Sequence, residues 1–338
     1  MLVVSAVNLV TFNTGYGIGL TSPMLGQLTG LYLDEDNFSW FASSLVIGQI
    51  IGSLIGSTIA NRIGRKKTCI MAALFSSGGW AMLAASQNFW MLILARICTG
   101  LFDCLAIPGG YMYISEVSET KLKGSFLNSN AIASGLGIAF GYLFGSNFLW
   151  RYTCFVALLV NATGIVTFLL CYESPVFLLM KKQVTQDFKI KSQSIRHFQS
   201  ARDCLNWYRE LTLETKEYSQ ELEKELKELE SDITSDGQGV KETVGRLLQG
   251  SNLKAFLTVM MLFIFFPLCG VYNITFFAVD LFKKLELGGA ETVAVMTALI
   301  RCLGTCASTV LMLKYDLKRT ATLIIIVICS DLGGGPST

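Results

Sequence analysis

Charged side chains are scarce in this sequence. Asp, Glu, Lys and Arg together make up 15% of its 338 residues, whereas 52% are hydrophobic. Soluble domains carry about 25% charged residues, so this composition excludes an ordinary soluble domain. The charges cluster in a few short stretches. Several of the runs between them reach the roughly 20 apolar residues that a membrane-spanning helix needs, which predicts an all-α membrane protein.

Residues that bind metals, phosphates or cofactors are few or badly placed. The single histidine, His197, lies in a polar segment and is expected to be solvated. Nine of the ten cysteines lie in or at the ends of apolar runs, and their spacing fits neither a zinc site nor a disulfide framework. We expect them to act as small buried hydrophobic residues. No phosphate-binding glycine loop or nucleophile motif is present, so neither an enzyme nor a cofactor or metal site is expected.

Apolar runs of spanning length predict about nine transmembrane helices. Six of them form a complete N-terminal bundle over residues 1–171, and a polar linker over residues 172–253 follows. An incomplete C-terminal bundle occupies residues 254–338. The predicted spans cover residues 2–23, 40–60, 68–86, 90–113, 124–147, 152–171, 254–282, 290–313 and 320–333.

Positive charge in the loops predicts the orientation of the helices, because Lys and Arg next to a span resist translocation. The loops after the second, fourth and eighth spans are richer in Lys and Arg than the alternate loops. The N-terminus and the linker are therefore predicted to be cytoplasmic. Trp40, Trp90 and Trp150 each lie at a predicted outer boundary, where indole rings prefer to sit. Asn37 begins a glycosylation sequon, but its closeness to the next span disfavours modification.

The linker is polar and highly charged. Within it, Leu222, Leu226 and Leu229 share one face, as in an amphipathic surface helix. A solvated helix beneath the bundle explains this pattern better than a nucleic-acid or calmodulin site. We therefore expect no nucleic-acid partner, and we expect the lipid bilayer to surround the apolar spans.

Glycines repeat at helical spacing in two spans. Such small residues let helix backbones approach closely. They are Gly48, Gly52 and Gly56 in the second span, and Gly137, Gly141 and Gly145 in the fifth.

Three short motifs lie where apolar spans end. Residues 61–67 read Asn-Arg-Ile-Gly-Arg-Lys-Lys, in which Gly64 allows a tight turn between two helices. Residues 112–116 read Met-Tyr-Ile-Ser-Glu and are followed by Lys-Leu-Lys-Gly at 121–124, and Glu-Ser-Pro at 173–175 closes the sixth span. The cations of such a loop can pair with carboxylates at neighbouring helix ends.

With these motifs the chain resembles the sugar porter branch of the major facilitator superfamily, and within it the insect trehalose and hexose facilitators. The signatures of the branch are D/N-R-x-G-R-R/K, Y-I-S-E followed by K-x-R-G, and P-E-S-P-R. The resemblance implies a major facilitator fold of twelve helices, of which this chain would hold the complete N-terminal half and a truncated C-terminal half. Its solute site would lie between the halves near the bilayer midplane.

The resemblance also implies a cytoplasmic gate of ion pairs. The matching residues are Arg62, Arg65, Lys66, Glu116, Lys123 and Glu173. The alternative interpretation is that these charges only set the topology. Tyr172 and Val176 depart from P-E-S-P-R, and Lys123 replaces an Arg. Because Lys is a poorer bidentate partner for a carboxylate, the gate is expected to be looser here.

The solute site that the resemblance implies has lost polar groups. The family has a Gln on the fifth helix and Q-Q-x-S-G-x-N on the seventh, where this chain has Ala131 and Phe-Pro-Leu-Cys-Gly-Val-Tyr over residues 266–272. An unpaired hydroxyl in a dry site costs about 1–3 kcal/mol, which disfavours glucose and favours a less polar solute. Pro267 is predicted to kink the seventh span. The candidate cavity residues are Asn130, Ala131, Tyr272, Asn273, Phe276 and Phe277.

Three charged residues fall inside predicted spans, where a charge marks a pathway or a buried pair. Asp103 lies near the middle of the fourth span and Arg301 near the middle of the eighth, while Arg96 lies two turns from Asp103 on a similar face. Proton symporters of the family often carry an Asp after the Gly-Tyr of the first helix, where this chain has Gly17. This difference favours facilitated diffusion, with Asp103 as a structural, hydrogen-bonded carboxylate.

We therefore expect a multi-pass plasma-membrane carrier that moves a sugar or sugar-like solute by alternating access. Two alternatives stay open. One is a non-transporting, shortened protein that acts as a sensor or associates with a full-length carrier. The other is a proton-coupled sugar symporter that uses Asp103 as its proton site.

Overall fold

The computed structural model describes residues 1–29, 37–118, 120–187, 203, 253–254, 256–258, 260–261, 265, 270–285 and 289–314. Over these residues the chain is helical apart from short turns. The helices are α1 (Leu2–Leu28), α2 (Phe38–Ile63), α3 (Arg65–Ala84), α4 (Phe89–Val117), α5 (Thr120–Asn147), α6 (Trp150–Leu170), α7 (Pro175–Asp187), α12 (Val271–Lys284) and α13 (Ala290–Lys314). The predicted ninth span and the predicted amphipathic helix of the linker lie outside the described residues.

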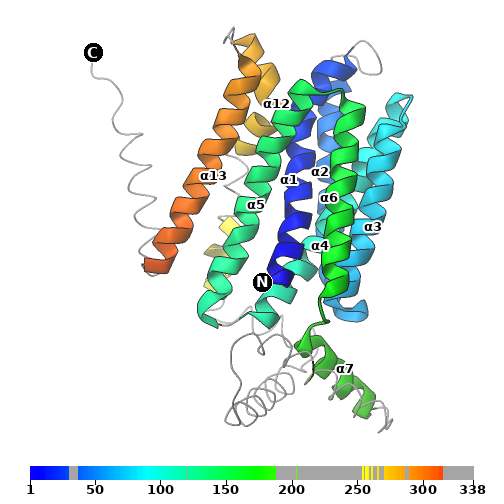
Figure 1. The fold of residues 1–338 in the computed structure, drawn as a ribbon, viewed down its shortest axis with the longest axis vertical. Coiled ribbons are helices and arrows are strands. Elements are labelled where there is room, and N and C mark those ends of the chain that lie inside the picture. Colours follow the sequence, from blue (N-terminus) through cyan, green and yellow to red (C-terminus); the bar gives the residue numbers. More distant parts are fainter. Residues whose placement is uncertain are drawn as a thin grey trace.

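Helices α1 to α6 form an antiparallel bundle (Figure 1). Helix α1 is enclosed by α4, α5, α6 and α12, and every residue from Asn13 to Leu25 is buried. Helix α1 extends five residues beyond the predicted span, to Leu28, and so continues through Pro23. A helix that is buried on all sides is the centre around which a bundle packs.

The predicted glycine contacts are confirmed. A Cβ at Gly52 of α2 would overlap the carbonyl oxygen of Leu101 in α4. A Cβ at Gly137 of α5 would overlap the carbonyl oxygen of Phe12 in α1. Because neither position leaves room for a side chain, the two helix pairs pack backbone against backbone.

Five of the described helices are long and apolar enough to cross a membrane, namely α1, α2, α4, α6 and the segment Ala290–Ala307 of α13. Helices α3 and α5 lie beside them in the same bundle (Figure 1). The N-terminus and α7 lie at the same end of the bundle (Figure 1), as the loop charges predict for the N-terminus and the linker.

The structure also shows where the predicted boundary tryptophans and the predicted buried cysteines lie. Trp40 and Trp90 are exposed near the starts of α2 and α4, as an indole at a membrane boundary would be. Trp150 begins α6, also at a helix boundary, but its side chain is buried in the same core cluster as Met24 of α1. The described cysteines are free thiols, and most are buried, as the sequence indicates.

The C-terminal helices contact the bundle through α1 and α5. The predicted span over 254–282 is not continuous: α12 begins after Gly270, which has a left-handed φ of 77°. Phe277 has non-helical angles, φ −119° and ψ 18°, which kink α12. Pro267, at which a kink was predicted, lies outside the described residues. The two halves therefore meet through the kinked helix α12, which contacts α1, and through α13, which contacts α5.

Candidate functional site

Arg65 and Glu116 form a bidentate ion pair at the end of the bundle where α7 begins. The Arg65 Nη2 atom lies 2.8 Å from Glu116 Oε1, and Arg65 Nε lies 3.1 Å from both carboxylate oxygens. The two side chains are only 3% and 14% exposed. Phe177 of α7 covers the guanidinium, whose Cζ lies 5.2 Å from the ring centre. This pair ties the start of α3 to the last turn of α4.

Glu173 binds the start of α3. Its Oε1 atom accepts hydrogen bonds from the backbone N–H groups of Lys66, at 2.9 Å, and of Ser174, at 3.2 Å. The first N–H groups of a helix carry partial positive charge and lack partners within the helix. Gly64 precedes them with φ 116°, and a Cβ there would lie 2.5 Å from Glu173 Oε2. The turn therefore requires glycine.

Ser174 and Lys66 connect this network to α6. The Ser174 hydroxyl donates to Glu116 Oε2. The Lys66 ammonium donates to the carbonyl oxygens of Leu169, at 3.1 Å, and Cys171, at 2.6 Å, at the carboxyl end of α6. Helices α3, α4 and α6 are thus joined at one end of the N-terminal half. The sequence did not identify Ser174 as a partner of Glu116, although it lies inside the Glu-Ser-Pro motif.

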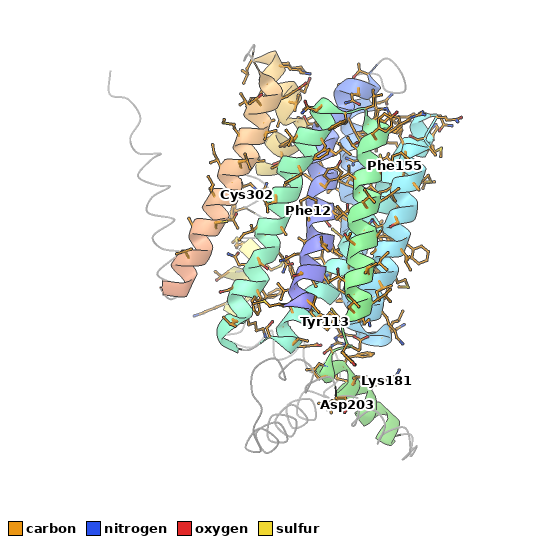
Figure 2. The ribbon with its side chains drawn as sticks, viewed as in Figure 1. Phe12, Tyr113, Phe155, Lys181, Asp203 and Cys302 are labelled. Atoms are coloured by element: carbon orange, nitrogen blue, oxygen red, sulfur yellow. The ribbon has the colours of Figure 1, made fainter. Side chains whose placement is uncertain are left out.

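The structure brings together four of the six predicted gate residues. Arg62 is exposed and Lys123 is half-exposed. Neither side chain forms an ion pair within the part of the chain that the structure describes. Tyr113 of the Tyr-Ile-Ser-Glu motif lies at the same end of the bundle (Figure 2), where its hydroxyl donates to the carbonyl oxygen of Tyr172.

Asp103 is a buried, hydrogen-bonded carboxylate. It is 4% exposed, and its Oδ1 atom accepts from the Ser76 hydroxyl at 2.5 Å and from Asn13 Nδ2 at 3.3 Å. Asn161 Nδ2 donates in turn to the Ser76 hydroxyl at 3.1 Å. The carboxylate thus joins α1, α3, α4 and α6, as expected of a structural residue.

Arg96 is fully buried but does not pair with Asp103. Its Nη1 atom donates to the carbonyl oxygen of Gly17 at 3.1 Å, and its Nη2 atom donates to the Thr21 hydroxyl. The guanidinium also lies over the Phe41 ring, 4.8 Å from its centre. Arg96, which the sequence places on a face similar to that of Asp103, thus has its hydrogen-bond partners on α1.

Described residues of both halves line two cavities, on different sides of α12. The first has a volume of about 590 Å³ and is lined by α2, α4 and α12. The residues that line it are Ala42, Ser43, Val46, Ile47, Gln49, Ile50, Ser53, Cys104, Phe276 and Phe277. The second has a volume of about 260 Å³ and is lined by α5, α12 and α13. Its lining is Ile138, Tyr142, Ile274, Thr275, Ala278, Thr297, Ala298, Ile300 and Arg301.

The predicted cavity residues are only partly found there. Phe276 and Phe277 line the larger cavity. Asn130 does not line either one: it is buried, and its Oδ1 atom accepts a hydrogen bond from Thr11 of α1 at 3.2 Å. Ala131 is exposed outside both cavities. The side chains of the two remaining candidates, Tyr272 and Asn273, lie outside the described residues.

Two findings were not anticipated from the sequence. Gln49 and Ser53, one helical turn apart on α2, supply polar side chains to the larger cavity. Their four-residue spacing, which places both side chains on one face of α2, was the available signal. Arg301, predicted as a buried charge, is instead exposed and lines the smaller cavity.

A helical bundle in two parts, with cavities between them and a charged network at one end, has the architecture of a major facilitator transporter. The fold is similar to that of the xylose transporter XylE from E. coli in its partially occluded inward-open conformation. The TM-score is 0.70 at 16% sequence identity, and the match covers 91% of this chain and 71% of XylE.

The sequence model of the "Sugar (and other) transporter" family matches residues 3–331. The chain therefore belongs to this family and is an integral membrane protein. A curated relative is the bovine (Bos taurus) solute carrier family 2 facilitated glucose transporter member 8, 25% identical over 340 residues, covering 96% of this chain and 65% of the relative. Another is the facilitated trehalose transporter Tret1 of Bombyx mori, 23% identical over 324 residues, covering 94% and 59%. The chain thus spans less than two thirds of the length of these relatives.

Proposed function

We propose that the protein carries a sugar or sugar-like solute of the trehalose and hexose class across the plasma membrane, by alternating access and down the solute gradient. The observation that carries this proposal is the 590 Å³ cavity between α2 and α4 of one half and α12 of the other. Cavities that hold small ligands have volumes of roughly 300–1,000 Å³, so this one is large enough for such a solute.

The lining of this cavity suits a sugar with few hydroxyl contacts. Phe276 and Phe277 offer aromatic surfaces for the apolar face of a sugar ring. The Gln49 amide can both donate and accept hydrogen bonds, and the hydroxyls of Ser43 and Ser53 can do the same. Because the remaining lining is mostly apolar, a solute with many unpaired hydroxyls would bind weakly.

The charged network supports movement of the N-terminal half as a rigid body. Arg65, Glu116 and Glu173 are bonded to partners within that half. Helices α3, α4 and α6 therefore move together, and the cavity opens by displacement of α12 and α13 against them. Rocking of one half against the other around a fixed site is the usual mechanism of such folds.

Uncoupled transport is supported by the environment of Asp103. Its carboxylate already accepts hydrogen bonds from Ser76 and Asn13 in the core of the N-terminal half. Cys104, the next residue along α4, lines the larger cavity, whereas Asp103 does not. We therefore assign Asp103 a structural role and no proton-carrying role.

The proposal is tested by uptake of labelled trehalose, glucose and polyols into proteoliposomes that contain the full chain. We expect saturable flux that stops when the solute concentrations inside and outside the proteoliposomes are equal. Gln49→Leu should raise the KM for the transported solute about tenfold, because a buried solute hydroxyl loses a partner worth about 1.4 kcal/mol. Gln87→Leu, at an exposed position after α3, is the matched control.

Three outcomes would contradict parts of the proposal. No saturable flux of any of these solutes, with insertion of the protein verified, would overturn the carrier function. Flux that requires a co-reconstituted full-length relative would support an accessory role instead. Equal effects of Gln49→Leu and Gln87→Leu would exclude the larger cavity as the solute site.

A further inference from the structure

Arg301 lies near the midpoint of α13. It is 11 residues beyond Ala290, the first residue of the helix. At 1.5 Å per residue this places it about 16 Å along the helix axis. The hydrocarbon core of a bilayer is about 30 Å thick, so Arg301 lies close to the midplane. Its neighbour Cys302 marks this position midway along α13 in Figure 2.

The position of Arg301 on α13 is away from the lipid-facing side. The exposed apolar side chains Met296 and Leu303 mark that side. Leu303 is two residues from Arg301, about 200° around the helix axis. Ala298 and Cys302, which are buried, lie on the packed side, about 60° and 100° from Arg301. The Arg301 side chain therefore begins at the margin of the packed face.

From this margin Arg301 lines the 260 Å³ cavity between α5, α12 and α13. Tyr142 of α5 lines the same cavity. The Tyr142 hydroxyl itself already donates to the carbonyl oxygen of Thr275, and the Thr297 hydroxyl donates to that of Val293. Arg301 is the charged residue among the described residues that line this cavity, and the lining comes from α5 of one half and from α12 and α13 of the other.

The acidic side chains described on α12 and α13 have other partners. Asp280 pairs with Lys284 at 3.3 Å, and Glu291 pairs with Lys283 at 3.6 Å. Arg301 forms neither an ion pair nor a side-chain hydrogen bond with any residue that the structure describes. An Arg at this depth is costly without an anionic partner, and such residues mark substrate and ion pathways.

We propose that Arg301 binds the anionic group, a carboxylate or a phosphate, of a small solute in this cavity. The proposal rests on the carrier function proposed above and extends its solutes to anionic sugars. A guanidinium presents paired N–H donors that match both groups. The cavity is below the usual range of roughly 300–1,000 Å³, which favours an anion of monosaccharide size or smaller. Lipid phosphates lie at the membrane surface, about 15 Å from the midplane, and so do not reach it.

The test measures equilibrium binding of glucuronate, glucose and inorganic phosphate to the full chain in phosphatidylcholine nanodiscs. We expect glucuronate to bind at least tenfold more tightly than glucose. Arg301→Gln should weaken glucuronate binding at least tenfold and leave glucose binding within twofold. Arg301→Lys should retain part of the affinity, because it keeps the charge but loses the bidentate geometry. Lys283→Gln removes a charge from an exposed position and should change neither ligand.

The outcomes separate this inference from the carrier function. Glucose flux with no binding of either anion would overturn the inference and leave the carrier function intact. Anion binding that depends on Arg301, with no flux of any sugar, would support the site and overturn the carrier function. If Arg301→Gln and Arg301→Lys each weaken the binding of glucose as much as that of glucuronate, Arg301 has a structural role. If the Arg301 substitutions change anion binding only after phosphatidylglycerol is added, the group bound by Arg301 is a lipid headgroup and not a solute. A structural role of Arg301 and a lipid headgroup as its ligand would each overturn the proposal.

Discussion

The backbone N–H of Val279 donates to the hydroxyl of Ser22, at 2.9 Å, and so joins α12 to α1. In a regular helix this N–H would donate to the carbonyl oxygen of Thr275, four residues earlier. The kink at Phe277 lies between the two groups, and the Thr275 oxygen accepts a hydrogen bond from Tyr142 of α5. Both ends of one helical hydrogen bond therefore have side-chain partners in the N-terminal half.

These two contacts predict that Ser22 and Tyr142 hold α12 against the N-terminal half. Ser22→Ala removes the acceptor of the Val279 N–H, and Tyr142→Phe removes the donor to Thr275. A hydrogen bond contributes about 1 kcal/mol. Each change should therefore lower the population of molecules in which α12 is held against the N-terminal half about fivefold. This population is measured by double electron–electron resonance, which gives the distances between spin labels on α1 and α12. Ser22→Thr keeps a hydroxyl and serves as the control; identical distance distributions in all four proteins would contradict the prediction.

The Arg65–Glu116 pair predicts a large difference between two charge-removing variants. Glu116→Gln leaves the buried Arg65 guanidinium without its anion and should destabilise the protein by about 3–5 kcal/mol. Arg62→Gln changes an exposed side chain without an ion pair in the described structure, and should stay within about 0.5 kcal/mol. Thermal unfolding of the detergent-solubilised protein compares the two. Similar melting temperatures for both variants would show that the pair is not a stabilising contact.

The backbone conformation of Gly64 predicts that an alanine at this position destabilises the protein. Gly64→Ala forces φ 116° on a residue with a side chain, and its Cβ would meet the Glu173 carboxylate. The expected cost is about 1–3 kcal/mol for the backbone alone. Gly78, an exposed residue inside α3, has nothing within 4 Å of the position that a methyl group would occupy, so Gly78→Ala should stabilise by about 0.5–1 kcal/mol. Chemical unfolding measures both; destabilisation by Gly78→Ala, or none by Gly64→Ala, would refute this account of the turn.

The motifs and glycine repeats predicted contacts successfully because their chemistry requires specific neighbours. Gly52 fits only against a backbone, and Arg65 pairs with the carboxylate of Glu116 where α3 and α4 end together. The facing of single side chains was harder to predict. Lipid and protein interior are both apolar, so hydrophobic periodicity does not distinguish a packed helix face from a lipid-facing one. This explains why the burial of Trp150 and the exposure of Arg301 were not predicted. Gln49 was likewise not recognised as a cavity residue.

Asp103 predicts transport that does not depend on a proton gradient. Asp103→Asn keeps an acceptor for Ser76 and Asn13, so the initial uptake rate should stay within about twofold of the wild type. An imposed inward proton gradient should cause no solute accumulation in either protein, because a structural carboxylate carries no proton across. Asp103→Leu is the contrast: it leaves the Ser76 and Asn13 donors unpaired, at about 1–3 kcal/mol each, and should lower the melting temperature. Proton-driven accumulation that is present in the wild type and absent in Asp103→Asn would instead establish a proton symporter.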